Sequence, residues 1–195
     1  PCFDIAAACS GFVYALQVGT DMLRSGRYRR ALVIGAEKLS SVVDWQDRAT
    51  CVLFGDGAGA AILETTATPD VGVLGNLLGA DGVNAELLHC VAGGSAQPAS
   101  EQTLRDRQHF LRMNGKEVFK LAVRVMADSC ERVLKGCGKR SDDVAWFIPH
   151  QANIRIVEAV ADQLQVGLDR FPINLDRYGN TSAASIPLAL EEAWS

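Results

Sequence analysis

The sequence predicts an α/β protein with mostly parallel sheets. Short apolar runs of strand length alternate with longer stretches in which apolar residues recur at helical spacing. Hydrophobic residues make up 48% and charged residues 22% of the 195 residues, which is typical of a globular protein that can bury a real core. In parallel sheets, active sites gather at the carboxyl ends of strands, so the residues that follow strands are the first candidates for a site.

The first part of the chain alternates in this way. Cys2–Ala6 is interpreted as a strand that runs into a turn, and residues 12–23 follow with the spacing of a helix that Gly26 ends. Ala31–Ala36 is a short apolar run typical of a buried strand. Gly57–Leu63 is another, rich in small residues that permit close backbone approach.

A polar stretch at residues 64–70, which contains Pro69, is the best candidate boundary between two halves. We therefore divide the chain into residues 1–68 and residues 69–195. The region from residue 80 to residue 100 has the composition of a long loop, and such loops in compact proteins are often functional.

The second half repeats the alternation. Residues 115–135 have helical spacing and end at a pair of glycines. Val144–Pro149 is interpreted as a strand, residues 154–164 as a helix, and Phe171–Leu175 as a short strand. A last helix follows Ser185, with a proline tolerated in its first turn.

Charge and composition exclude several functions. A net charge of −4 argues against non-specific binding of nucleic acid. No apolar run is long enough to span a bilayer, and there is no signal peptide, so we expect a cytoplasmic protein without membrane contact. The six cysteines form no C-x-x-C pair and no zinc spacing, which predicts reduced, mostly buried thiols and no metal site. Because the chain starts at Pro1 and stops inside a helical pattern, we expect a fragment that lacks both ends.

Cys9 is the candidate nucleophile. It lies in FDIAAACSGF, after a predicted strand and at the start of a predicted helix. The dipole of a helix N-terminus favours the thiolate, and a thiolate can attack a thioester and hold the acyl group covalently. The alternative is a buried structural cysteine, which is the commoner role.

His150 and Asn180 are the other two candidates. His150 follows a predicted strand, where an imidazole can donate a hydrogen bond to a developing oxyanion. Asn180 follows a glycine in a run of small residues, which is typical of a tight loop that approaches a ligand. The alternatives are a structural histidine and a turn or helix-cap asparagine.

Together these motifs resemble a known family. FDIAAACSGF, FGDGAGAAIL, PHQANIRI and DRYGNTSAASIPLAL are similar, in this order, to the β-ketoacyl-acyl-carrier-protein synthase III enzymes. The resemblance covers essentially the whole chain. It implies the thiolase fold, a layered αβαβα arrangement of two similar halves, which would be incomplete here.

The resemblance also implies a reaction. Cys9 would take the acyl group from a short acyl-CoA, and malonyl-acyl carrier protein (malonyl-ACP) would then lose carbon dioxide and attack the acyl-cysteine, initiating fatty-acid biosynthesis. His150 and Asn180 would hydrogen-bond the enolate oxygen. Acyl-CoA and malonyl-ACP are substrates, so no cofactor and no metal are expected. The protein would be an acyltransferase that acts with acyl carrier protein and forms a homodimer when full-length.

Further residues match binding positions of the family. The resemblance implies that Arg48 contacts the adenine end of CoA. It implies a pantetheine tunnel lined by Gly115, Phe119 and Asn153, although Phe119 equally suits a helix core. The basic residues expected to meet acyl carrier protein are Lys120 and Arg155.

Three alternatives stay open. A priming synthase of polyketide or quinolone pathways, or an acyltransferase relative, would share the same Cys-His-Asn set. A non-catalytic partner subunit is a third reading, although such subunits commonly lose the nucleophile. The acyl chain that the enzyme prefers does not follow from the sequence. Because the family's glycine-rich carboxyl-terminal strand and its amino-terminal region are absent, we expect the fragment alone to be inactive.

Overall fold

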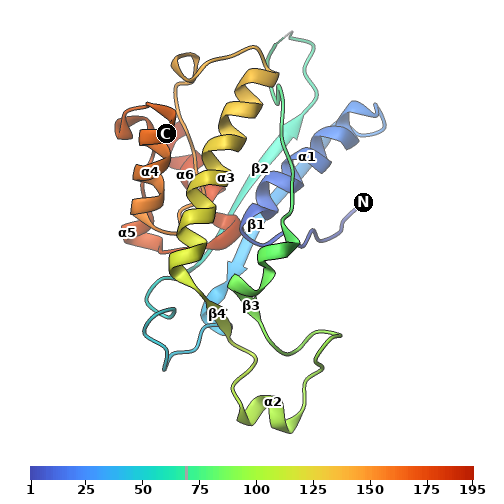
Figure 1. Ribbon diagram of the computed structural model, residues 1–195. Helices are drawn as coiled ribbons and strands as arrows, with labels where there is room; N and C mark the ends of the chain where they lie inside the picture. Colours follow the sequence, from blue (N-terminus) through green and yellow to red (C-terminus); the bar gives the residue numbers. More distant parts are fainter. Residues whose placement is uncertain (69) are drawn as a thin grey trace.

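The computed structural model describes residues 1–68 and 70–195, so Pro69, in the expected boundary, lies outside the described residues (Figure 1). The helices are α1 (Gly11–Arg24), α2 (Glu101–Arg105), α3 (Gly115–Gly136), α4 (Ile154–Leu164), α5 (Leu175–Tyr178) and α6 (Ser185–Trp194). The strands are β1 (Arg30–Lys38), β2 (Asp56–Glu64), β3 (Leu88–Cys90) and β4 (Leu111–Met113). Short 3₁₀ turns lie between them: η1 (Ala8–Ser10), η2 (Leu39–Ser41), η3 (Gly82–Leu87), η4 (Ser141–Asp143), η5 (Leu168–Arg170) and η6 (Ser182–Ala184). In the described part of the chain, no helix is both long and apolar enough to cross a membrane.

The sheets correct the expectation of mostly parallel strands. Within the described residues, β1 pairs with β2 and β3 pairs with β4, and both pairs are antiparallel. A parallel pair needs a crossover connection, usually a helix, that returns the chain to the same end of the sheet. The segment between β1 and β2 contains only the turn η2, so the chain reverses and the second strand runs back along the first.

One face of the β1–β2 sheet holds both α1 and α6. Val33 on this face is buried against α1, and the next inward positions on the two strands are the paired glycines Gly35 and Gly59. A Cβ on Gly35 would lie 2.6 Å from the carbonyl oxygen of Ala183, and one on Gly59 would lie 2.8 Å from Pro187. Only glycine permits this approach, which seats η6 and the start of α6 on the sheet beside the start of α1.

The opposite face of this sheet is apolar and exposed. Leu32, Ile34 and Ile62 are 63%, 55% and 72% exposed. They alternate with the buried positions because successive side chains of a strand point to opposite faces. Charged residues flank this apolar patch at the ends of the same face, with Arg30 and Glu64 paired at one end and Lys38 and Asp56 at the other. An exposed apolar patch of this kind is unusual for a sheet that meets water.

A second core lies between α3 and α4, which run side by side (Figure 1). Its largest members are Phe147 and Phe171, whose rings stack with centroids 5.2 Å apart. The aliphatic residues Ile156, Val157 and Val160 project from α4 onto them. The helical spacing of residues 154–164 predicted α4, and Val157 and Val160 are buried on its packing face.

Three expected strands are not formed. Cys2–Ala6 is irregular and mostly exposed, and Val144–Pro149 and Phe171–Leu175 are extended without a ladder. The last two segments do lie together, since Phe147 N–H donates to the carbonyl of Arg170 at 2.9 Å. A strand needs a partner that satisfies its backbone groups at successive residues, and one such bond between neighbours does not make a ladder.

The long loop predicted at residues 80–100 contains the short elements η3 and β3, and α2 and β4 follow it. The excursion between the two strands, with α2 at its tip, extends away from the rest of the chain (Figure 1). Its base is tied down by Asp44, which is buried and contacts the guanidinium groups of Arg107 and Arg112. This contact holds the pKa of Asp44 below its usual range, chiefly through the hydrogen bond from Arg107.

Candidate active site

Cys9 lies in η1, which continues directly into α1. Ala8 adopts a positive φ of 45°, and a Cβ on Gly11 would lie 3.3 Å from that of Ala183, so a tight turn places the thiol beside η6. The structure corrects the expectation of a lowered thiol pKa. Burial raises the pKa of Cys9, and the nearby Glu37 carboxylate raises it further, while a hydrogen bond with Ser182 acts in the opposite direction. The resting nucleophile is therefore a protonated thiol.

His150 is held between α4 and η6. Its Nδ1 lies 3.2 Å from the hydroxyl of Ser185. Burial lowers the pKa of His150 to about 4, and a hydrogen bond with the backbone of Ser182 opposes this only in part. The imidazole is thus neutral at physiological pH and can donate a hydrogen bond without carrying a charge.

The neighbour of His150 fixes the backbone there. Gln151 is fully buried, and its amide donates to the carbonyl of Pro172 at 2.8 Å while its Oε1 accepts from Asn174 N–H at 2.9 Å. Both halves of the amide are used, which links the His150 segment to the loop that leads to Asn180. This is a structural role that the sequence analysis did not assign.

Asn180 is joined to the first half of the chain. Its backbone N–H donates to the carbonyl of Leu53 at 2.8 Å, and Gly55 N–H donates to the carbonyl of Asn180 at 2.9 Å. The side-chain Oδ1 accepts from Ser182 N–H at 2.9 Å. Because the oxygen is taken, the amide nitrogen is the part of this buried side chain that is left to act as a donor.

Ser182 is the junction of the site. Its hydroxyl lies 3.2 Å from Oε1 of Glu37, and its backbone N–H donates to Oδ1 of Asn180. Hydrogen bonding with Ser182 also lowers the pKa of Cys9 and raises that of His150, each against the larger effect of burial. His150 and Asn180 lie 141 and 171 positions after Cys9 in the sequence. The three candidate catalytic residues are therefore brought to one residue by the fold. Sequence reasoning missed both Ser182 and Glu37.

A pocket of about 540 Å³ has Asn180 in its lining, whereas Cys9 and His150 do not line it. Phe54 and Phe119 form apolar parts of its walls. The structure places five of the six predicted binding residues along it: Gly115, Phe119, Lys120, Asn153 and Arg155. This mixed lining suits a mostly apolar ligand that carries a few polar groups.

The surroundings of three of the predicted binding residues differ. Arg48 is exposed and does not line the pocket, although Ala49 beside it does. Lys120 pairs with Glu117 at 2.9 Å on the surface of α3. Asn153 caps α4, since its Oδ1 accepts from Arg155 N–H at 3.0 Å, which leaves its amide nitrogen for other partners.

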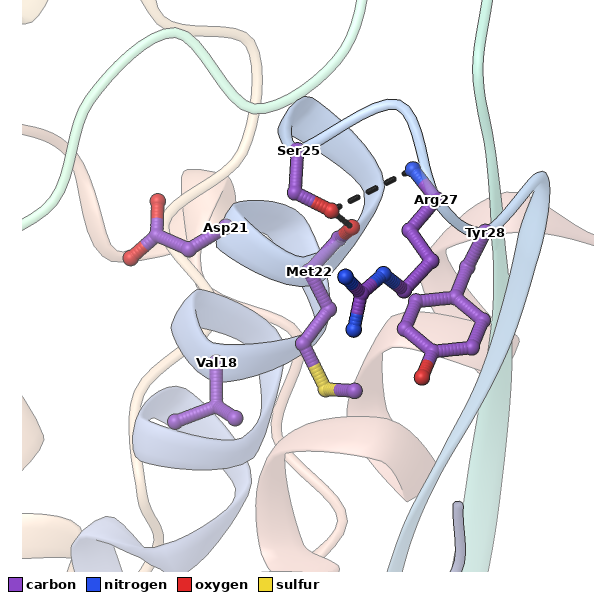
Figure 2. Close-up of a pocket in the computed structure, with 6 residues that line it drawn as sticks. All are labelled: Val18, Asp21, Met22, Ser25, Arg27 and Tyr28. Atoms are coloured by element: carbon purple, nitrogen blue, oxygen red, sulfur yellow. Dashed lines mark hydrogen bonds between the residues drawn. The ribbon is translucent and has the colours of Figure 1, made fainter.

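A second hollow lies at the far end of α1 (Figure 2). It is lined by Val18, Asp21, Met22, Ser25, Arg27 and Tyr28. The Ser25 hydroxyl donates to the carbonyl of Met22 at 2.7 Å and accepts from Arg27 N–H (Figure 2). Both the donor and the acceptor function of this hydroxyl are therefore used by neighbouring residues. A helix of 14 residues is about 21 Å long, which separates this hollow from Cys9.

The cysteines also differ from the expectation of buried thiols. All six are free, but Cys2 and Cys90 are exposed and the other four are half-buried. Burial raises the pKa of Cys90 and of Cys130, so neither is an activated thiol. The pKa of Cys9 is raised too, and Cys9 differs from the other two in that a hydrogen bond with Ser182, which also holds Asn180, opposes this rise.

Two family models match most of the chain. Residues 3–82 match the model described as 3-oxoacyl-[acyl-carrier-protein] synthase III, and residues 134–195 match the model of its C-terminal part. Among curated relatives, a β-ketoacyl-[acyl-carrier-protein] synthase III of Roseiflexus castenholzii is 54% identical over 191 residues. One of Caldanaerobacter subterraneus is 50% identical over 192 residues. Each alignment covers 98% of this chain and 58% of the relative, so the chain spans a little over half of their length.

Solved structures give the same picture. The synthase III of Aquifex aeolicus superposes with a TM-score of 0.88 at 46% identity, covering 98% of this chain and 57% of that one. The priming β-ketosynthase of the R1128 polyketide pathway superposes with a TM-score of 0.84 at 35% identity, with coverages of 98% and 56%. These neighbours confirm the thiolase fold that the sequence resemblance implied.

Proposed function

Because the chain belongs to the 3-oxoacyl-[acyl-carrier-protein] synthase III family, we propose that it catalyses the decarboxylating condensation of a short acyl-CoA with malonyl-ACP. The observation that carries the proposal is that Cys9, His150 and Asn180 all lie around Ser182, with Asn180 also lining the pocket that holds five of the predicted binding residues. The reaction would initiate fatty-acid biosynthesis.

In the first stage, the Cys9 thiol loses its proton and attacks the thioester carbonyl. The CoA sulfur leaves with a proton, and the acyl group stays on the cysteine. Covalent catalysis of this kind divides one difficult transfer into two easier ones. The placement of Cys9 at the start of a helix that contacts η6 supports this role, because η6 contains Ser182, whose backbone N–H holds the side chain of Asn180.

In the second stage, malonyl-ACP loses carbon dioxide and the resulting thioester enolate attacks the acyl-cysteine. Negative charge develops on the thioester oxygen, and two neutral donors stabilise it without protonating the carbon. The neutral state of His150 and the anchored amide of Asn180 both suit this task. Removal of one such donor typically costs about 10²–10³ in rate.

The pocket is proposed to hold the pantetheine arm that both substrates share. Gly115, Phe119 and Asn153 line it, and the exposed Arg48, next to the lining residue Ala49, is proposed to contact the adenine end of CoA. Lys120 and Arg155 add positive charge to the lining, as contact with an acidic carrier protein would require.

The finer assignments rest on the family resemblance. We propose a cytoplasmic enzyme that works as a homodimer, with the division between its two halves near residues 68 and 69. The proposed chemistry uses two thioester substrates and the side chains described above, and it calls for no metal or organic cofactor.

A second candidate is the priming step of a polyketide pathway, because one structural neighbour at 35% identity is a priming ketosynthase. Both reactions would use the same three side chains. A panel of acyl-CoAs and acceptors, followed by mass spectrometry, separates the two by the acyl chain and carrier protein that support turnover.

The main test uses the protein encoded by the complete open reading frame. We expect acetyl-CoA to add an acetyl mass to the peptide that contains Cys9. We expect His150→Ala and Asn180→Ala to reduce malonyl-ACP decarboxylation by about 10²–10³ while acyl loading falls much less. Label on another cysteine, or equal loss of both half-reactions, would contradict the assignment.

A further inference from the structure

One wall of the pocket is a loop. Residues 42–55 connect η2 to β2, and Ala49, Leu53 and Phe54 of this loop line the pocket. Most of the other lining residues belong to α3 or to the start of α4, and these two helices are fixed to each other by the second core. The loop lies outside that core. The width of the pocket therefore depends on what holds the loop against the rest of the lining.

The carboxyl end of this loop is joined to the backbone of Asn180. Asn180 N–H donates to the carbonyl of Leu53 at 2.8 Å, and Gly55 N–H donates to the carbonyl of Asn180 at 2.9 Å. The two bonds form a parallel bridge between Phe54 and Asn180. The side chain of Asn180 has a contact of its own, because its Oδ1 accepts from Ser182 N–H at 2.9 Å. The bridge therefore fixes one end of the loop, while the reacting amide is held separately.

The amino end of the loop is fixed by a buried carboxylate. Asp44 is 4% exposed, and its Oδ1 and Oδ2 accept from Nη2 and Nε of Arg107, with the second distance 3.3 Å. Arg112 supplies a second guanidinium, whose Nη1 lies 3.8 Å from Oδ2 of Asp44. Beside this cluster, the carbonyl of Val42 accepts from Leu111 N–H at 2.9 Å. A carboxylate held by a guanidinium at two points is fixed in orientation as well as in distance.

Arg107 is itself held in place. It adopts a φ of 55°, a left-handed conformation that is uncommon outside glycine and persists where the surrounding structure determines it. Its guanidinium carbon lies 4.9 Å from the ring centroid of Phe110, and its carbonyl accepts from the side chain of Arg112 at 3.0 Å. Directly after Arg112, Met113 enters the pocket lining, and α3 begins two residues later. The ion pair therefore joins the loop to the segment that leads into the opposite part of the lining.

Between its two fixed ends, the loop is stiffened by Asp47. The Asp47 carboxylate accepts from Ala49 N–H at 2.9 Å and from the hydroxyl of the buried Thr50 at 2.8 Å. The N–H of Asp47 donates in turn to the carbonyl of Asp44 at 2.8 Å. Because these bonds follow one another along the chain, a displacement at Asp44 is passed to the lining residue Ala49 and to Arg48, which lies between Asp47 and Ala49.

We propose that Asp44 is a positioning residue, whose ion pair with Arg107 holds residues 42–55 at the spacing that admits the pantetheine arm of the thioester substrates. This inference rests on the proposed function, in which that arm occupies the pocket. Asp44 does not line the pocket, so it acts through the loop and not on the substrate. Its negative charge lies between two guanidinium groups, and its loss would leave Arg107 and Arg112 to repel each other at the junction.

The test measures KM and kcat for acetyl-CoA and malonyl-ACP in the protein encoded by the complete open reading frame. Asp44→Asn keeps the shape of the side chain and removes its charge. It should raise the KM for both substrates about tenfold and change kcat less than about threefold, because it weakens binding without touching the side chains proposed to react. Arg107→Gln should have the same effect from the other side of the ion pair. The dissociation constant of free CoA, measured by isothermal titration calorimetry, should rise with KM in both variants.

Two further variants separate positioning from general damage. In the double variant Asp44→Asn/Arg107→Gln, KM should rise by about the same tenfold as in either single variant and not by the product of the two, because both changes remove one interaction. Arg105→Gln is the matched control. It removes an exposed ion pair with Glu101, at 3.4 Å in the same excursion, and should leave KM, kcat and the dissociation constant of CoA unchanged.

The outcomes are distinct. A raised KM with little change in kcat, not multiplied in the double variant, supports the inference, whereas native KM values or multiplied effects overturn it. If Asp44→Asn fails to fold, Arg107→Gln, at a partly exposed side chain, still decides the question. A protein that catalyses no condensation but binds CoA more weakly when either partner is changed would refute the proposed function and leave this inference intact. An active enzyme with native KM values in both variants would refute this inference alone, and a protein that binds no CoA would refute both.

Discussion

His150 makes the stability of this protein depend on mild acid. The perturbation is a fall in pH from 7 to 4, compared between the native protein and the variant His150→Gln. Burial lowers the pKa of His150 from the ordinary 6.5 to about 4. Between these two pH values the imidazole is protonated in the unfolded chain and stays neutral in the folded chain. Stability therefore falls as pH falls, and the loss occupies the window between about 6.5 and 4.

The magnitude follows from the size of the pKa change. A difference of one pKa unit corresponds to 1.36 kcal/mol, so a change from 6.5 to about 4 amounts to about 3 kcal/mol of unfolding free energy once pH 4 is reached. This is a large part of the stability of an ordinary domain. The pKa of the Asp44 carboxyl is lowered, so its contribution to the free energy of unfolding is lost only at still lower pH. This contribution is the same in the native protein and in His150→Gln.

The assay is urea unfolding at several pH values between 7 and 4. The native protein should lose about 3 kcal/mol more than His150→Gln over this interval. Parallel curves for the native protein and His150→Gln would refute the reasoning, because they would mean that the imidazole is protonated equally in the folded and unfolded states.

Three further predictions concern docking, backbone contact and packing. Arg155→Glu should raise the KM for malonyl-ACP and flatten its dependence on ionic strength, and unchanged kinetics would remove this residue from the docking surface. Gly55→Ala should destabilise the fold by several kcal/mol, because its Cβ would lie on the carbonyl oxygen of Tyr178, whereas Gly94→Ala, where space is open, should change the unfolding midpoint little. Phe12→Ala should cost about 3–5 kcal/mol in the same unfolding experiment, since this side chain is fully buried between α1 and the sheet.

The helices show how far local pattern reaches. α1, α3, α4 and α6 begin and end close to where apolar spacing and glycine stops placed them. A helix satisfies its backbone hydrogen bonds within its own segment, so its sequence contains most of the information that it needs. The short helix α2 and the strands β3 and β4 were missed, because three to five residues are too few to establish a period.

The strands show the limit of the same reasoning. β1 and β2 were recognised from their composition, but their antiparallel pairing was not, since the direction of a strand depends on where the chain turns. Val144–Pro149 has the composition of a strand and remains extended without a ladder. Whether an apolar run becomes a strand depends on a partner that lies elsewhere in the chain.

The candidate site was likewise predicted only in part from the sequence. The motifs around Cys9, His150 and Asn180 identified the residue types that the proposed chemistry needs. The protonation states did not follow from them, because the raised pKa of the thiol and the lowered pKa of the imidazole both result from burial.

The sequence by itself determined the family, the main helices and the three side chains proposed to react. Only the tertiary structure decided how these side chains are oriented and charged. The contact between Ser182 and Glu37 joins residues that are 145 positions apart in the sequence. The residues next to each of them in the sequence do not predict this contact. Such contacts form when Gly35 and Gly59 let η6 settle on the β1–β2 sheet, so the environment of the nucleophile depends on packing between distant segments.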